Sequence, residues 1–474
     1  MRKLVFGLLV AAVVLVSCPK AVSQETEDIV GIWQGTLNIS GIELRLVFKI
    51  ERAEDGTLTA LMDSPDQSSF DNPVDSVSFS DGKLDLAMPA LFLSLSGKMA
   101  EDGQSIDCQF TQGGMQLPLA LERTEKEVEL NRPQTPEPPY PYDTLAVTFE
   151  NKTDGVTLAG TLTLPQGEPP FAAAVLITGS GAQDRDEMIF AHRPFLVIAD
   201  FLTRNGIAVL RYDDRGMGAS TGHFVTSTSE VFARDAQAGV EFLRAREDIE
   251  NNKIGLIGHS EGGMIAPMIA AKDHEIGFVV MMAGTGVTGE EILIEQSELI
   301  SVAENVDREI IEFNLKLSGE LYQVLKSDAD SAAIESELRA IIDKSLSDLT
   351  DEQREAYDIN ETMLEPHIKQ MVTPWFRFFV SYDPAVDIAK VKCPVLVLNG
   401  ELDLQVSAEQ NVPAIEKALQ AGGNTDYKIH RFERLNHLFQ TCETGAVSEY
   451  GIIEETISPK VLQIMGEWIT THAR

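Results

Sequence analysis

The chain has 474 residues, with 74 aspartates and glutamates against 38 lysines and arginines, so its formal net charge at pH 7 is −36. Such a polyanion repels phosphate backbones and anionic lipid, which excludes nucleic acid as an expected partner. The length indicates two or three domains, and a hydrophobic content of 43% is normal for a globular chain with a real core.

The N-terminus has the pattern of an export signal. Two positively charged residues precede an apolar run over residues 4–16, which is shorter than the roughly 18 residues of a membrane span. One cleavage route would leave Cys18 with a lipid anchor, and the other would remove residues 1–23 as a signal peptide. Either route predicts an exported protein that is periplasmic, extracellular or lipid-anchored at a bacterial membrane. No later run has the length and apolar character of a membrane span.

The chain has four cysteines. Because either route of processing would consume Cys18, at most one disulfide can form among Cys108, Cys393 and Cys442. A bond between Cys393 and Cys442 is conceivable, but we expect three buried thiols that act as small apolar side chains. Cysteine and histidine form no cluster with metal-ligand spacing, so we expect neither a metal nor a cofactor.

Residues 25–125 are predicted to form a small all-β N-terminal domain. Strand patterns over residues 31–37 and 43–50 are followed by further short strands at intervals of about ten residues. Acidic-glycine pairs such as Asp81-Gly82 stand between the strands and are typical of hairpin turns. We expect an antiparallel barrel or sandwich.

A proline-rich segment follows this domain. Five prolines lie between residues 133 and 141. Because proline has no backbone N–H donor and stiffens an extended chain, residues 126–142 are predicted to be a linker.

From residue 143 onward, strand patterns alternate with helical patterns. The strands are unbroken apolar runs, as expected of parallel strands that are covered on both faces. They lie at residues 173–178, 207–211, 253–257, 277–282 and 394–398. The alternation predicts a doubly wound α/β domain over residues 143–474.

One long interval, at about residues 285–390, contains helical periodicity but no convincing strand. An insertion of this size within an open sheet favours a helical cap over the functional site. The alternative is a helical layer on the surface with no such role.

The strongest motif is Gly258-His259-Ser260-Glu261-Gly262, which follows an apolar strand and precedes a helical pattern. A Gly-x-Ser-x-Gly segment between strand and helix is the nucleophile elbow, a strained turn that raises the serine hydroxyl above the sheet. The motif therefore predicts Ser260 as a nucleophile.

A serine nucleophile needs a general base, and the base needs an orienting carboxylate. In this arrangement the partners follow in the order serine, acid, histidine. His437 lies in the loop after the strand pattern at residues 427–432, whereas His430 lies within that strand and His472 lies at the chain end. We therefore predict His437 as the base.

The acid is expected in the turn that follows the strand at residues 394–398. Asp403 occupies the position of a triad carboxylate, and Gly400 allows the sharp exit from the strand. Glu401 is a rival candidate, and Asp383 and Asp387 are weaker ones. The carboxylate would hold the histidine tautomer and stabilise the imidazolium as it forms.

The oxyanion hole is expected to use two backbone N–H groups. One belongs to Glu261, the residue after the nucleophile. The other belongs to the loop at residues 178–183, which we call the oxyanion loop, where Ser180 is the first candidate and Gly181 the second.

The segment Arg211-Tyr212-Asp213-Asp214-Arg215-Gly216-Met217-Gly218 contains a Gly-x-Gly sequence. A dinucleotide site would require a helix that opens directly at the glycines and an acidic residue at the end of the next strand, and neither is present. We expect a structural loop in which Arg215 is paired with a carboxylate.

These motifs together resemble the EstD-type bacterial esterases, which are similar to the wider group of serine-aminopeptidase-like hydrolases. The resemblance rests on residues 179–186, the segment around Arg215, the Ser260 elbow and Leu435-Asn436-His437-Leu438-Phe439. It covers roughly residues 143–474 and implies an α/β-hydrolase fold with carboxylesterase activity on short acyl esters and no cofactor. Thr178 stands where many relatives have histidine.

The expected reaction is acyl transfer through Ser260, on a small-molecule ester. A serine aminopeptidase is the first alternative, because acidic residues of the predicted cap could bind a substrate ammonium group. These residues are Glu290, Glu291, Glu295 and Glu298. The second alternative is a non-catalytic binding protein on a hydrolase scaffold.

Overall fold

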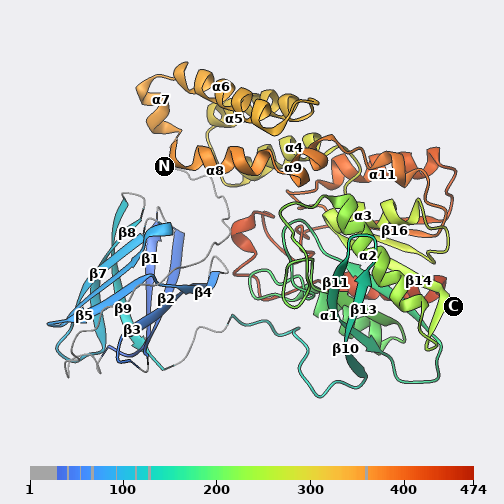
Figure 1. Ribbon diagram of the computed structural model, residues 1–474, viewed down its shortest axis with the longest axis horizontal. Helices are drawn as coiled ribbons and strands as arrows, with labels where there is room; N and C mark the ends of the chain where they lie inside the picture. The colour runs from blue at the N-terminus through green and yellow to red at the C-terminus, as the bar shows by residue number, and fades with distance from the viewer. Residues whose placement is uncertain are drawn as a thin grey trace. The chain divides into compact units, whose positions relative to one another are not determined.

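The computed structural model describes residues 29–39, 42–53, 55–65, 69–91, 93–112, 115–125, 130–357 and 361–473 (Figure 1). The predicted signal segment, residues 1–23, and Cys18 therefore lie outside the described residues. Contacts within the chain divide it at Asn131 and Arg132 into two compact units. Across the described ranges, no helix combines the length and the apolar character that crossing a membrane requires.

The N-terminal unit is a single sheet of nine strands in the order β4-β3-β2-β1-β9-β8-β7-β6-β5, and every neighbouring pair is antiparallel. The strands are β1 Gly31–Ile39, β2 Ile42–Arg52, β3 Leu58–Ser64, β4 Ser69–Pro73, β5 Ser76–Ser80, β6 Lys83–Met88, β7 Leu93–Met99, β8 Ser105–Gln112 and β9 Met115–Thr124. The prediction of an all-β domain is confirmed, and its form is a half-barrel with Trp33 and Phe48 in the core.

One turn of this sheet illustrates how the sequence determines the register. Asp81 and Gly82 both have positive φ, of 52° and 71°, and they join β5 to β6 by pairing Ser80 with Lys83. Two residues with positive φ form the turn that suits the right-handed twist of a hairpin, and glycine adopts this conformation at little cost. The predicted Asp-Gly turn is thus confirmed.

The C-terminal unit contains an eight-stranded sheet in the order β10-β11-β13-β12-β14-β15-β16-β17. Its strands are β10 Asp143–Asn151, β11 Val156–Leu164, β12 Phe171–Ile177, β13 Ala208–Tyr212, β14 Ile249–His259, β15 Val279–Met282, β16 Val395–Gly400 and β17 Tyr427–Phe432. The two pairs that involve β11 are antiparallel, and the pairs from β13 through β17 are parallel. The predicted doubly wound α/β domain is confirmed.

Helices cover both faces of this sheet. Residues of β12 alternate between the two hydrophobic cores, with Ala173 and Val175 in one and Ala174 and Leu176 in the other. The first core includes residues of α2, α3, α10 and α11, and the second includes residues of α1 and α12. These helices are α1 Pro194–Arg204, α2 Ser229–Arg244, α3 Glu261–Ala270, α10 Ala385–Ile388, α11 Ala408–Ala421 and α12 Pro459–His472. Burial of both faces explains why the strand sequences lack polar alternation.

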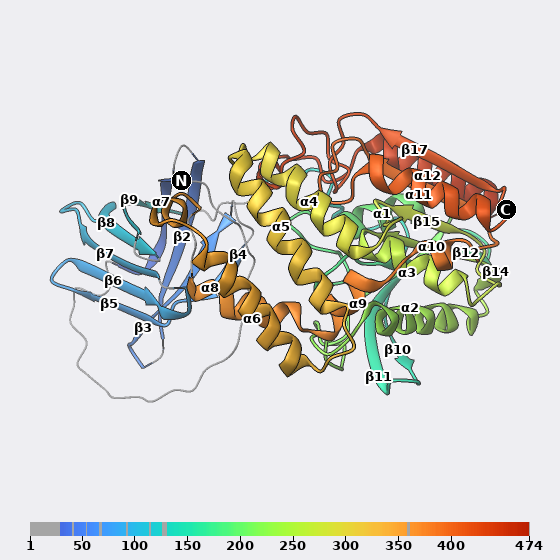
Figure 2. The same ribbon diagram turned by 90° about the horizontal axis from the view of Figure 1, so that it is seen from above.

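The chain between β15 and α10 forms the helical insertion, which we define as α4 to α9. Its helices are α4 Gly289–Ala303, α5 Arg308–Leu325, α6 Ser331–Ser347, α7 Asp351–Ala356, α8 Glu361–Met371 and α9 Pro374–Ser381 (Figure 2). Leu325, Leu338 and Val380 belong to a separate apolar core within the insertion. The helical character expected of this interval is confirmed.

Residues 130–142 of the predicted linker lie within the described residues, whereas residues 126–129 lie outside them. The Arg132 guanidinium donates hydrogen bonds to the carbonyl oxygens of Phe190, Gly451 and Ile453, at 2.7–3.0 Å. The Gln134 side chain donates to the carbonyl of Ile457 at 2.7 Å. These bonds hold Arg132 and Gln134 in a stretch without regular secondary structure.

Candidate active site

Ser260 lies at the sharp turn between β14 and α3, with φ of 53° and ψ of −116°. A Cβ atom added to Gly258 would come within 1.9 Å of the Gly262 carbonyl oxygen, and one added to Gly262 would come within 2.1 Å of the Ile177 oxygen. No larger residue fits at either position, so the two glycines permit the turn. A non-glycine residue in this backbone region is strained, as the predicted nucleophile elbow requires.

The structure joins Asp403 to His437. The Asp403 Oδ2 atom accepts a hydrogen bond of 2.9 Å from Nδ1 of the histidine. Its Oδ1 atom accepts the backbone N–H groups of Gln405 and Val406 at 2.9 and 2.8 Å. Both side chains are buried, so this carboxylate is held in one orientation and fixes the His437 ring through Nδ1, with Nε2 on the opposite side of the ring.

His437 lies next to the nucleophile turn. Its carbonyl oxygen is 3.0 Å from Nε2 of His259, the residue before Ser260, and the two histidine rings are 4.8 Å apart between centroids. Among the residues the structure describes, no hydrogen bond joins the Ser260 hydroxyl to the His437 ring. Such bonds are often long without substrate and shorten in the substrate complex.

The rival carboxylates lie elsewhere. Asp387 accepts a hydrogen bond of 2.7 Å from the Tyr382 hydroxyl and pairs with Lys390. Asp383 accepts the backbone N–H of Ala385, and Glu401 faces Arg431 at 3.6 Å. The histidine geometry therefore favours Asp403.

The oxyanion loop follows β12 and is fixed by side chains from neighbouring loops. Asp214 accepts one hydrogen bond from the Thr178 hydroxyl at 3.0 Å and another from the Gln183 backbone N–H at 2.9 Å. Ser180 lies between these anchors and is exposed. Glu261 is the first residue of α3, where the backbone N–H has no acceptor within the helix.

Two buried acidic groups line a small cavity beside this loop, Asp214 and Glu261. Burial, reinforced by the nearby Glu261 and Glu187 carboxylates, raises the pKa of Asp214 to about 8, although its hydrogen bonds lower the pKa. Burial also raises the pKa of Glu261 against the lowering effect of two hydrogen bonds. Its Oε1 atom accepts those bonds from Ser229 at 2.6 Å and from Trp375 of α9 at 2.9 Å.

A family model described as serine aminopeptidase, S33, matches residues 193–441, which is more than half of the chain. The chain belongs to this family. The esterase EstD of Thermotoga maritima is 26% identical over 322 residues, which cover 68% of each protein. An uncharacterized protein YfhR of Salmonella typhi is 29% identical over 141 residues, covering 29% of the chain and 44% of the relative.

Among solved structures, an esterase of Pyrococcus furiosus aligns over 74% of this chain and all of its own, with 15% identity and a TM-score of 0.43. The family model and the similarity to EstD confirm the resemblance to EstD-type esterases and to serine-aminopeptidase-like hydrolases. The order and direction of the strands in the C-terminal unit agree with the predicted α/β-hydrolase fold.

Three of the four acidic residues that the aminopeptidase alternative invokes are engaged within the helical insertion. Glu290 pairs with Lys326, Glu298 pairs with Arg308, and Glu291 forms a capping box with Thr288 at the start of α4. Glu295 is half-buried, and burial raises its pKa despite a hydrogen bond from Ser407. Three of the four carboxylates thus stabilise the helical insertion.

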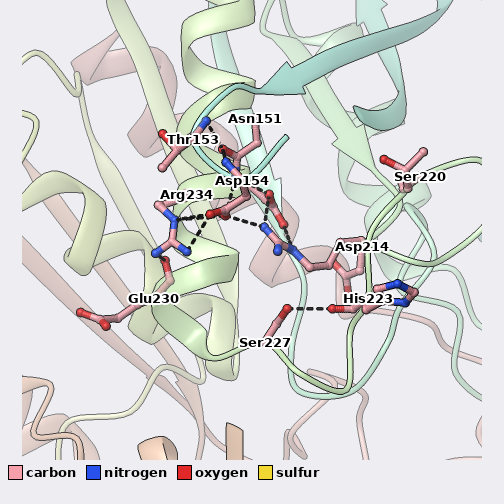
Figure 3. Close-up of polar contacts among 12 residues, drawn as sticks. Asn151, Thr153, Asp154, Asp214, Ser220, His223, Ser227, Glu230 and Arg234 are labelled. Atoms are coloured by element: carbon pink, nitrogen blue, oxygen red, sulfur yellow. Dashed lines mark hydrogen bonds and ion pairs between the residues drawn. The ribbon is translucent and has the colours of Figure 1, made fainter. Parts of the chain in front are cut away.

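The segment around Arg215 is a structural loop, as predicted. Arg215 donates to Asp235 at 2.6 Å and to Asp154 at 2.9 Å, and its side chain is only 7% exposed. Asp154 also accepts hydrogen bonds from Arg234 (Figure 3). Asn151 donates to Asp235 at 2.7 Å. This charge cluster ties the end of β10 to the loop after β13 and to α2.

The predicted thiols are confirmed as free. Cys108 and Cys442 are buried, and Cys393 is half-buried. Burial raises the pKa of Cys442 to about 11, so this thiol stays protonated at neutral pH.

Sequence reasoning missed three side chains beside the nucleophile turn. They are Glu187, Ser229 and Trp375, and they reach the turn from the loop after β12, the start of α2 and the helical insertion. Glu187 also has a φ of 52°, which is unusual for a residue other than glycine. This feature is visible only in the structure.

Proposed function

We propose that this protein hydrolyses carboxylic esters through an acyl-enzyme intermediate on Ser260. The buried Asp403–His437 pair, which lies beside a serine on a strained turn, is the observation that carries this proposal. The similarity to the esterase EstD supports an ester as the substrate.

In the proposed mechanism, Nε2 of His437 takes the proton of the Ser260 hydroxyl as Oγ attacks the ester carbonyl. The oxyanion accepts hydrogen bonds from the backbone N–H groups of Ser180 and Glu261. His437 then gives its proton to the leaving alcohol, and a water activated by the same ring releases the acid. Asp403 keeps the Nδ1–H tautomer and stabilises the imidazolium.

The helical insertion is proposed to act as a cap. Trp375 of α9 binds Glu261, the residue after the nucleophile, so the insertion contacts the site directly. The preference for short acyl groups is proposed from the resemblance of the chain to EstD-type esterases.

An aminopeptidase is the second candidate, favoured by the family to which the chain belongs. The pairing of Glu290 and Glu298 with basic residues weakens it, because carboxylates engaged in this way are not free to bind an ammonium group.

The test is a panel of p-nitrophenyl esters of increasing acyl length, run beside aminoacyl anilides on wild type and Ser260→Ala. We expect ester turnover that favours short acyl chains and falls by about 10⁶ in the variant, as in other triad enzymes. Ser347→Ala, which changes an exposed serine of α6, is the matched control and should retain full activity. Turnover of anilides alone, or equal ester turnover by wild type and Ser260→Ala, would contradict the proposal.

A further inference from the structure

A chain of three hydrogen bonds runs beneath the nucleophile turn. The Gly179 backbone N–H donates to Oε1 of Glu187 at 2.6 Å, and the same oxygen lies 3.0 Å from Nδ1 of His259. The other ring nitrogen, Nε2, lies 3.0 Å from the carbonyl oxygen of His437. Glu187 and His259 are both buried, so water does not compete for these contacts. This series of hydrogen bonds joins the oxyanion loop to the predicted general base.

The positions of the protons in this series of hydrogen bonds can be deduced from which atoms donate and which accept. A carbonyl oxygen can only accept, so Nε2 of His259 must carry a hydrogen. The Oε1 atom already accepts the Gly179 N–H, which favours the ionised carboxylate. Imidazole is also a stronger base than a carboxylate, with ordinary pKa values of about 6.5 and 4.3. The remaining proton therefore belongs on Nδ1, and the ring carries hydrogens on both nitrogens.

We infer that His259 is a permanent imidazolium, held by Glu187, which positions the general base and the oxyanion loop. A buried cation needs such a paired carboxylate, since burial without a partner would remove its proton. Although burial lowers the pKa of His259, the charge and hydrogen bond of Glu187 outweigh it, and the pKa lies above its ordinary value. The role in catalysis rests on the proposed function, whereas the charge state does not.

Titratable groups reach this pair from several loops. Asp403 follows β16, His437 follows β17, and Asp214 follows β13 beside Glu187. The His259 ring lies 4.8 Å from the His437 ring between centroids, and the paired negative charge of Glu187 limits the effect of the imidazolium on that ring.

The first measurement uses ¹⁵N-labelled histidine in the full-length protein, with His259 assigned by the loss of its signals in His259→Gln. We expect both ring nitrogens of His259 to show imidazolium shifts at pH 7, above the ordinary histidine pKa of about 6.5. A neutral tautomer of His259 at pH 7 would overturn the inference whatever the enzyme hydrolyses.

The second measurement compares Glu187→Gln with wild type on the same ester. Loss of the carboxylate should neutralise the ring and lower kcat about 10- to 100-fold with little change in KM, because the base and the oxyanion loop lose their fixed positions. Asp426→Asn is the matched control, because it removes an exposed carboxylate from His472, a half-buried histidine of α12, and it should leave kcat unchanged. An unchanged kcat in Glu187→Gln, or an imidazolium that persists at His259 in that variant, would refute the role of Glu187.

Discussion

Replacing Arg215 by methionine should destabilise the C-terminal unit by several kcal/mol. The guanidinium is 7% exposed and bonds to Asp235, whose side chain is 3% exposed. Without it, Asp235 keeps one hydrogen bond from Asn151, whereas Asp154 keeps its pair with Arg234. Removing one partner of a buried ion pair costs about 3–5 kcal/mol, because the other charge stays buried without compensation.

This free energy converts to a change in melting temperature. The C-terminal unit has about 340 residues, and unfolding entropy is about 2.1 cal/mol/K per residue, which totals about 0.7 kcal/mol/K. A loss of 3–5 kcal/mol thus lowers the Tm by about 4–7 °C. Scanning calorimetry of the full chain measures this shift directly.

Arg234→Met provides the matched control for Arg215→Met. Its side chain is 41% exposed, and its partner Asp154 would keep the bond from Arg215. Such a partly exposed pair is worth at most about 1 kcal/mol, so the Tm should fall by about 1 °C. The double variant Arg215→Met/Asp235→Leu should recover most of the lost Tm, since an apolar pair can replace a buried ion pair. Equal shifts for Arg215→Met and Arg234→Met would refute the reasoning.

Three further predictions concern the site itself. Asp403→Asn should lower kcat for a p-nitrophenyl ester by about 10⁴-fold at unchanged Tm, because the wrong histidine tautomer is stabilised; a loss below tenfold would favour another acid. Trp375→Phe removes one of two donors to buried Glu261, so calorimetry should show a loss of about 1–3 kcal/mol. The pKa of Asp214, raised from 3.8 to about 8, means that the folded state binds a proton that the unfolded state has released. The contribution of Asp214 to the free energy of unfolding is complete below about pH 4, declines as pH rises and is lost above about pH 8. The Tm difference between wild type and Asp214→Asn should follow that decline, and a constant difference would contradict it.

Sequence reasoning succeeded where local pattern or chain order constrains the structure. Unbroken apolar runs predicted β12 to β16 because strands covered on both faces have no polar alternation. Chain order narrowed the candidates for a general base to His437, and the structure places the predicted Asp403 at 2.9 Å from Nδ1 of that ring. Each of these inferences needed only neighbours in sequence or the direction of a parallel strand.

The contacts that remained hidden are side-chain bonds between distant loops. Trp375 of the helical insertion donates a hydrogen bond to Glu261. No periodic pattern in the sequence around either residue predicts this contact. Glu187 stands in an acidic run, which as a sequence feature is typical of a solvated loop. Only the folded chain shows that its carboxylate is buried against His259.

Thr178 shows how the first residue of the oxyanion loop is held. Its hydroxyl donates to buried Asp214. That carboxyl also accepts the Gln183 N–H at the other end of the loop, so one side chain anchors both ends.

The strongly acidic composition therefore has two physical roles. Exposed carboxylates account for solubility, but those after β12 and β13 act as acceptors for loops that have few backbone partners of their own. Asp213 binds the Arg185 guanidinium and backbone N–H, and Asp186 binds Arg211. With Glu187 they hold the region around the oxyanion loop by charge and hydrogen bonds instead of regular secondary structure. Asp214, whose raised pKa favours the neutral carboxyl, contributes hydrogen bonds alone. Loops built in this way should lose order when their carboxylates are neutralised, while the apolar sheet beneath them remains intact.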